Sequence, residues 1–189
     1  MFGPILFPRP AMLLRSAVLV AIALLSAFAA QPVIAAEGPS GLPLPRFATT
    51  RSTPINVRVG PGTRYNVAWV YVKAGTPVEI VQEFDTWRKV RDADGSEGWI
   101  HQNLLSGKRA GVVVVPEGQE QAVLLAGRSN DSGVRAYLGP GYRVDVQKCD
   151  GAWCAVSATY TPPNGGHANV SGYLPQTRLW GVYSDEAFD

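Results

Sequence analysis

From residue 55 onward, short apolar runs alternate with turn residues along the chain. The runs INVRV, VAWVYV, TPVEIVQEF, WRKVRD and EGWIH are rich in Val, Ile, Trp, Tyr and Phe, and AGT, FDT and DADGSE separate them. Aromatic and β-branched residues favour strands, and Gly, Asp and Ser favour the turns between them. Beyond the first 36 residues, no apolar stripe at helical spacing persists for about twelve positions. The pattern therefore predicts an all-β fold.

The last third of the chain resembles a diverged copy of this region. FDTWRKV is similar to CDGAWCAV, and EGWIHQNLLSG is similar to SGYLPQTRLWG. The spacing between Trp87 and Trp153 is about eight residues shorter than the spacing between Gly98 and Gly172. A loop insertion within TYTPPNGGHAN explains this difference. In the same comparison Gly139 lies opposite Gly75.

We therefore predict two small β-barrels in tandem. The first occupies residues 54–109, the second and more divergent one occupies 110–183, and 184–189 form a tail. Residues 37–53 (EGPSGLPLPRFATTRST) are rich in Pro, Gly, Ser and Thr without apolar periodicity, which is typical of an extended linker.

The N-terminus has the order of a secretory signal peptide, which we place at residues 1–36. Arg9 and Arg15 precede or flank the uninterrupted apolar run SAVLVAIALLSAFAA, and the small residues Ala35 and Ala36 follow it. The run is shorter than the roughly twenty residues that a membrane-spanning helix needs, although a retained anchor stays an alternative. We expect an exported protein, periplasmic or extracellular, that meets the membrane only transiently through this segment.

Removal of Arg9 and Arg15 leaves a neutral chain. The full sequence has 17 Lys and Arg against 15 Asp and Glu, so the mature chain has 15 of each. A chain without net charge is not steered to nucleic acid by its overall field, and we expect no nucleic-acid partner.

The first repeat strongly resembles the bacterial SH3 (SH3b) family over about 55 residues. That resemblance rests on Asn56-Val57-Arg58, Gly60-Pro61, Lys73 with Gly75, Asp85 with Trp87, and the final Gly98-Trp99-Ile100. Two copies behind a signal peptide resemble exported tandem SH3 proteins of α-proteobacteria. The resemblance implies a five-stranded barrel per unit and a role in recognising peptidoglycan or its peptides. The second copy has VLLAGRS where the first has NVRVGPG, so the resemblance there concerns the fold more than binding.

Residue chemistry also interprets the Gly-Pro-Gly stretch. Pro61 fixes φ and removes a backbone donor between two glycines, so the chain must leave its strand there. A phosphate-binding loop would need Lys-Ser or Lys-Thr at the start of a helix, whereas Gly62-Thr63-Arg64 leads into another strand. We interpret the stretch as a bend.

Aromatic residues are the best ligand candidates. Trp69 and Tyr71 alternate with Val70 and Val72, so the two aromatics share one face of a strand. We favour exposure of at least one of them, with core placement as the alternative. Tyr65 and Arg64 flank the bend and can together stack on a ring and pair with a carboxylate.

Two further aromatic positions recur in both repeats. Trp87 corresponds to Trp153, and Trp99 corresponds to Tyr173, next to Gly98 and Gly172. Recurrence favours a structural duty, and we expect these rings to fill the barrels.

No catalytic set emerges from the sequence. His101 and His167 are isolated, and no thiol has a base and an orienting group nearby in the pattern. Glu83 with Asp85, and Asp92 with Asp94, lie at strand ends and in turns where Asp bonds to its own backbone. We expect no enzyme, no cofactor and no metal site.

Cys149 and Cys154 are the only cysteines and stand five positions apart. A two-residue turn at Asp150-Gly151 would leave the thiols diagonal, whereas a four-residue loop DGAW would place them opposite each other. We favour a disulfide. The overall prediction is an exported, non-catalytic module that binds peptidoglycan; the alternative is an envelope scaffold that binds a protein segment or self-associates.

Overall fold

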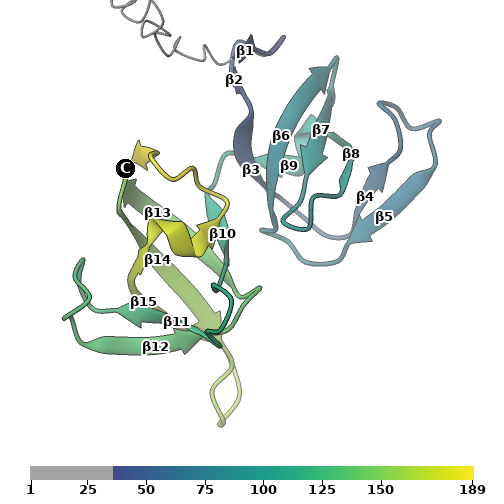
Figure 1. Ribbon diagram of the computed structural model, residues 1–189. Coiled ribbons are helices and arrows are strands. Elements are labelled where there is room, and N and C mark those ends of the chain that lie inside the picture. Colours follow the sequence, from purple (N-terminus) through teal and green to yellow (C-terminus); the bar gives the residue numbers. More distant parts are fainter. Residues whose placement is uncertain (1–35) are drawn as a thin grey trace, which may run out of the picture. The chain divides into compact units, whose positions relative to one another are not determined.

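The computed structural model describes residues 36–189, which form two consecutive strand-built units (Figure 1). We call residues 46–106 the first barrel and residues 110–188 the second barrel. The prediction of an all-β fold is confirmed: between residues 36 and 189 there is no α-helix, and the helical elements are two short 3₁₀ turns, η1 (Gln102–Leu104) and η2 (Gln176–Arg178). Within that range no helix is both long and apolar enough to cross a membrane. The predicted signal peptide lies, apart from its last residue, outside the described residues.

The first barrel is a seven-stranded antiparallel sheet in the order β5-β4-β8-β7-β6-β3-β9. A two-stranded ribbon, β1 (Ala36–Glu37) with β2 (Pro43–Leu44), precedes it. The strands are β3 (Arg46–Thr50), β4 (Ile55–Arg58), β5 (Val67–Tyr71), β6 (Pro77–Phe84), β7 (Trp87–Arg91), β8 (Glu97–His101) and β9 (Leu105–Ser106).

The second barrel is an eight-stranded sheet in which β17 pairs with β13 beside the main order β12-β11-β15-β14-β13-β10-β16. The strands are β10 (Ala110–Val113), β11 (Ala122–Leu125), β12 (Val134–Leu138), β13 (Arg143–Asp150), β14 (Trp153–Tyr160), β15 (Ala168–Pro175), β16 (Leu179–Trp180) and β17 (Ala187–Phe188).

Each barrel has its own apolar core, built from alternate residues of its strands. The core of the first barrel consists of Ala48, Ile55, Val57, Val78, Ile80, Val90, Ile100 and Leu105. The core of the second barrel consists of Val113, Ala122, Leu124, Leu138, Val144, Val146, Cys149, Cys154, Val156, Ala158, Leu174, Leu179 and Val182.

The predicted linker over 37–53 is wrong for its second half. β3 lies there, pairs with β6 and β9, and buries Ala48, Thr49 and Thr50. The two threonines can be buried because their hydroxyls donate hydrogen bonds to backbone carbonyls, at 3.0 Å to Lys108 and 3.3 Å to Lys73. A short strand whose inward residues are Ala and Thr gives no apolar pattern, which is why the sequence did not reveal it.

The predicted tail over 184–189 is also wrong. Its residues include β17, which pairs with β13, and Glu186, which forms an ion pair with Arg109 at 2.6 Å. The pairing of Ala187 and Phe188 with the Cys149–Asp150 end of β13 explains why so short a segment is held.

Two details of the repeat comparison need correction. The extra residues near TYTPPNGGHAN lengthen the β14–β15 hairpin rather than its loop alone, because Ser157–Tyr160 pair with Ala168–Ser171. The counterpart of Gly75 is Gly141 rather than Gly139: both have positive φ (72° and 77°), and their amides donate to equivalent carbonyls, that of Thr50 at the end of β3 and that of Val113 at the end of β10.

Candidate binding site

The expected aromatic platform on β5 is wrong. Val70 and Val72 face solvent, at 43% and 71% exposure, whereas Trp69 and Tyr71 are half-buried and pack against the core of the first barrel. The two rings meet edge to face at 6.1 Å. Burial, together with Asp92 nearby, raises the pKa of Tyr71 to about 12 although Trp69 opposes the shift. The alternative in which the aromatics belong to the core therefore describes this strand.

Arg64 and Tyr65 do lie together on the loop between β4 and β5. The guanidinium lies 5.1 Å from the centre of the Tyr65 ring, and its Nη2 donates to the Tyr65 hydroxyl at 3.3 Å. The hydrogen bond to the Tyr65 hydroxyl raises the pKa of the Arg64 guanidinium. The pair is accessible, since Arg64 is exposed and Tyr65 is half-buried.

The residues of the SH3b-like motif shape this loop. A Cβ on Gly60 would lie 2.5 Å from the Tyr65 ring, so only glycine lets the ring pack there. Arg58 donates to the Tyr65 carbonyl at 2.7 Å. Pro61 lies half-buried within the bend, while Asn56 is exposed on the outer face of β4. The Gly-Pro-Gly stretch is thus a tight bend around a tyrosine.

Of the recurring aromatic residues, Trp99 is buried, whereas Trp87, Trp153 and Tyr173 are only half-buried. Gly98 and Ile100 face the core of the first barrel: Ile100 belongs to that core, and a Cβ added to Gly98 would lie 2.5 Å from Val57. Because neighbouring residues of a strand point to opposite faces, Trp99 lies on the other face of β8. It is nevertheless only 9% exposed. Trp87 is half-buried on the outer face of β7 and meets His101 edge to face at 5.5 Å.

The same outer positions recur in the second barrel. Trp153 and Tyr173 are half-buried on strands whose alternate residues, Cys154 and Leu174, are in the core. A Cβ on Gly172 would lie 2.5 Å from the Leu125 carbonyl oxygen, so glycine is required for the approach of β11 to β15. The aromatic residues thus recur because they occupy equivalent positions on the outer faces of the two sheets.

Several of the titratable residues considered for catalysis are engaged in structural contacts. Asp92 accepts backbone hydrogen bonds from Asp94 and Ser96 at 3.1 and 2.9 Å, and Asp85 stands in the β6–β7 turn with a φ of 49°. His101 accepts from the Asn103 amide at 3.3 Å, and His167 lies exposed in the β14–β15 loop. Glu83 is buried and forms ion pairs with Arg46 and Arg88.

Cys149 and Cys154 form a disulfide across the β13–β14 hairpin, with their Cα atoms 4.2 Å apart. They face each other directly in the strand register, which corresponds to the four-residue loop DGAW. Both thiols are therefore unavailable as nucleophiles.

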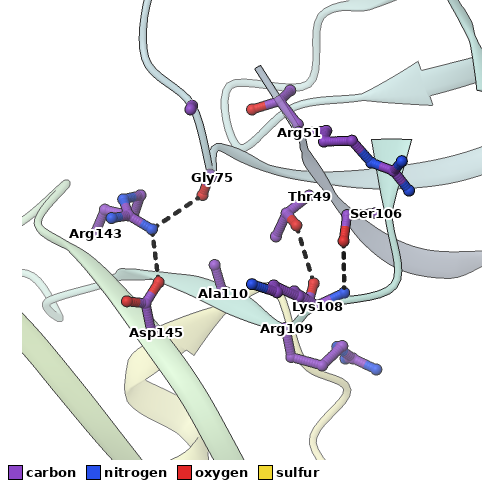
Figure 2. Close-up of a pocket in the computed structure, with 11 residues that line it drawn as sticks. Thr49, Arg51, Gly75, Ser106, Lys108, Arg109, Ala110, Arg143 and Asp145 are labelled. Atoms are coloured by element: carbon purple, nitrogen blue, oxygen red, sulfur yellow. Dashed lines mark hydrogen bonds and ion pairs between the residues drawn. The ribbon is translucent and has the colours of Figure 1, made fainter. Parts of the chain in front are cut away.

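A cleft of about 550 Å³ gathers basic side chains that the sequence analysis did not single out (Figure 2). Its walls come from the end of β3, the β5–β6 turn, the segment joining the two barrels, and the start of β13. The lining contains four cations and one carboxylate: Arg51, Lys108, Arg109, Arg143 and Asp145.

Three of the cations keep donors available for a ligand, but they differ in the contacts that they already make. Arg51 and Lys108 are exposed and make no ion pair within residues 36–189. Arg143 donates to Asp145 at 2.7 Å and to the Gly75 carbonyl at 3.4 Å, which holds it against the opposite wall, as Figure 2 shows. Its guanidinium still carries further donors.

The fourth cation, Arg109, serves the second barrel. Its two Nη atoms donate to Glu186 at 2.6 and 2.7 Å, and its guanidinium lies 4.7 Å from the centre of the Phe188 ring. Burial raises the pKa of Glu186, but the hydrogen bonds from Arg109 and the Tyr183 amide outweigh it and leave that pKa lowered. Arg109 is thus neutralised, and the cleft presents Arg51, Lys108 and Arg143.

This arrangement suits a carboxylate ligand. Two exposed cations, unpaired within the described residues, and one guanidinium held by Asp145 and Gly75 surround polar walls that include the Thr49 and Ser106 hydroxyl groups, although these already bond to Lys108 backbone atoms. The basic pair Lys108-Arg109 between the repeats was visible in the sequence. Arg51 lies in the segment that the sequence analysis interpreted as a linker. Arg143 comes from β13 of the second barrel, and only the three-dimensional fold brings it to the cleft.

Residues 51–107 match the family model described as Bacterial SH3 domain. The range covers most of the first barrel and ends within the wall of the basic cleft. The second barrel lies outside it, so its likeness to the first rests on the shared strand register. No curated protein matches the chain.

Two solved structures resemble parts of the chain. "Structure of NlpC2 from Trichomonas vaginalis" has 11% identity and a TM-score of 0.29, with 72% of this chain and 48% of that chain covered. "Structure of NlpC1 from Trichomonas vaginalis" has 12% identity and a TM-score of 0.29, with 79% and 50% covered. The chain spans about half the length of these proteins, and TM-scores this low do not establish a shared fold.

Proposed function

We propose that this protein is an exported, non-catalytic module that binds peptidoglycan through the free carboxylates of its peptides at the basic cleft. The single observation that carries the proposal is the concentration of Arg51, Lys108 and Arg143 around one cleft, although residues 37–189 together have equal numbers of basic and acidic residues. The Bacterial SH3 domain match supports a cell-wall ligand, because such domains commonly bind peptidoglycan.

Export is part of the proposal. The composition of residues 1–36 supports it, and so does the Cys149–Cys154 disulfide, because such bonds persist in oxidising compartments. Fractionation of producing cells tests it: the processed chain is expected outside the cytoplasm, and recovery only in the cytoplasm would contradict export.

Cosedimentation with purified sacculi tests binding. The double variant Arg51→Glu and Lys108→Glu reverses two cleft charges, and we expect at least about tenfold weaker binding, or about 1.4 kcal/mol. The matched control is Arg128→Glu with Lys148→Glu, which makes the same charge change on the second barrel away from the cleft. Equal binding by the two double variants would refute the cleft as the site.

Two further measurements, the salt dependence of sacculus binding and the release of dye from labelled wall, test the proposal. Binding to carboxylates in an open cleft should weaken as salt is raised from low to physiological ionic strength, since exposed charges are screened. Dye-labelled wall should release no more dye with the protein than with buffer. Release above that background would contradict the non-catalytic part of the proposal.

A further inference from the structure

The second barrel lacks an indole that the first barrel uses to fill its wall. In the first barrel Val57 pairs with Trp69, and in the second Leu124 pairs with Ala136; both hairpins shift register at the next residue. Ala136 therefore stands where Trp69 stands. The Trp69 Cη2 lies 2.9 Å from the position of a Gly98 Cβ, so the indole reaches across its barrel to β8.

Ala136 lines a pocket of about 370 Å³ in the second barrel. Ala136 and Leu138 of β12 form one wall, and Ala158 and Val170 of the lengthened β14–β15 hairpin form the other. Leu138 and Ala158 are members of the core, so the pocket opens toward the barrel interior. Two separate sequence changes, the lost indole and the hairpin extension, thus meet at one place.

Aromatic side chains frame the opening. Tyr137 is 62% exposed and Tyr160 is 45% exposed, so both rings are accessible beside the pocket. Tyr142 is fixed as a third side because its hydroxyl donates to the Thr159 carbonyl at 2.6 Å. The rim can therefore grip an apolar group whose polar end stays in water.

The strand next to the pocket has an unpaired side. β12 is the last strand of the sheet and pairs only with β11. An extended peptide can add to such an edge through main-chain hydrogen bonds while alternate side chains enter a pocket.

The one charged residue of the lining is Arg135, which is exposed and makes no ion pair within residues 36–189. An uncompensated guanidinium at the rim favours an occupant with a carboxylate.

From the vacated indole position, the free strand edge and Arg135, we propose that the second barrel binds an extended peptide segment of a partner protein that inserts an aromatic side chain flanked by an acidic residue. A peptide is favoured over a sugar because the inner walls, Ala136, Leu138, Ala158 and Val170, offer no side-chain hydrogen bonds, whereas the free edge of β12 offers main-chain ones. The site shares no lining residue with the basic cleft, so the proposal stands independently of sacculus binding.

The test uses the purified chain and the probe peptide acetyl-Val-Trp-Glu-Val-amide. Isotope-edited NMR is expected to show shifts confined to β12 and the β14–β15 hairpin. Replacing Trp by Ala in the probe should abolish them, and replacing Glu by Gln should weaken binding several-fold. No shift with the probe, or shifts with a chitotetraose probe alone, would overturn the proposal.

The decisive variant is Ala136→Trp, which restores the residue of the first barrel. We expect a folded protein that binds the peptide at least about tenfold more weakly and still cosediments with sacculi. Should the indole disturb folding, Tyr160→Ala and Arg135→Gln serve instead, because both side chains are exposed. Unchanged affinity in all folded variants would refute the site. Loss of sacculus binding in the cleft variants with peptide binding intact would leave this inference standing.

Discussion

At the residue scale, the buried carboxylate of Glu83 connects three parts of the first barrel. The side chain is fully buried and lies 2.6 Å from Arg46 Nη2 and 3.1 Å from Arg88 Nε. It also accepts hydrogen bonds from the Ser40 amide and hydroxyl, both at 2.8 Å. Burial acts to raise the pKa of Glu83, but the bonds from Arg46 and Ser40 prevail and lower it.

We expect Glu83→Gln to destabilise the protein by about 3 kcal/mol, because it leaves two largely buried guanidinium groups without a counter-charge. The folded-state pKa lies below the unfolded value of about 4.3. The stabilisation by Glu83 is therefore present at neutral pH and disappears as the pH falls below about 4.

Denaturant titrations between pH 3 and 7 measure both effects. The variant should lose part of the acid dependence shown by the parent. Glu97→Gln is the matched control, since Glu97 makes exposed ion pairs with Lys89 and Arg91, and it should change stability little. Similar losses in the two variants would contradict the assigned role of the buried cluster.

Gly75 offers a second prediction at this scale. Its φ is 72°, and an added Cβ would lie 2.6 Å from Arg143 Nη1 in the basic cleft. Gly141, its counterpart, has a φ of 77° and nothing within 4 Å of that position. Ala at either site should cost about 1 kcal/mol in thermal unfolding. Only Gly75→Ala should also weaken sacculus binding, because it displaces Arg143; equal binding by both variants would argue against a role for Arg143.

At the scale of elements, the β13–β14 hairpin is secured at its turn by several independent contacts. The disulfide closes the loop, and Asp150 accepts from the Trp153 and Ala152 amides. Those backbone bonds, with a contribution from Arg128, lower the pKa of Asp150 to about 2. Buried Gln176 accepts from the Gly151 amide and donates to the Glu186 carbonyl at 2.8 Å. The hairpin turn, η2 and the last residues are thus linked.

We expect reduction of the disulfide to lower the free energy of unfolding by about 2 kcal/mol, the chain-entropy estimate for so small a loop. Urea titrations with and without reductant measure the loss. The double variant Cys149→Ala and Cys154→Ala should have the same free energy of unfolding as the reduced protein, and reductant should not change it. A reductant effect on that variant would show that the measured loss has another origin.

The sequence revealed most strands because their alternation is strong, but it missed elements that lack it. β3 has Ala and Thr as inward residues, and β17 has two residues. It also left the orientation of β5 open, since Trp69-Val70-Tyr71-Val72 alternates equally well in either direction. The bulge after Val57 and the packing against Gly98 settle which face is inside, and neither is local information. The basic cleft likewise depends on residues from distant strands.

At the scale of the whole described region, aromatic residues join the C-terminal segment to β3. Phe47 meets Trp180 edge to face at 5.2 Å and Tyr183 at 4.8 Å. The Tyr183 hydroxyl donates to Glu79 at 2.9 Å, and burial followed by this carboxylate raises the pKa of the hydroxyl. These contacts link β3 and β6 of the first barrel to the C-terminal segment of the second barrel.

We expect Phe47→Ala to uncouple the unfolding of the two barrels, so that scanning calorimetry resolves two transitions where the parent shows one. Phe84→Ala is the matched control, because Phe84 is 58% exposed at the β6–β7 turn. It should leave the single transition in place. A single transition in both variants would show that the aromatic contacts do not couple the barrels.

The contacts of Phe47 also have a consequence for biosynthesis. The ribosome makes Phe47 early, but its covering rings, Trp180 and Tyr183, are made almost last. A nascent chain therefore carries an uncovered aromatic side chain until translation is nearly finished. Chains that terminate prematurely after the first barrel would keep the Phe47 ring exposed to solvent. A chaperone or protease that binds exposed apolar side chains could therefore distinguish incomplete molecules from finished ones.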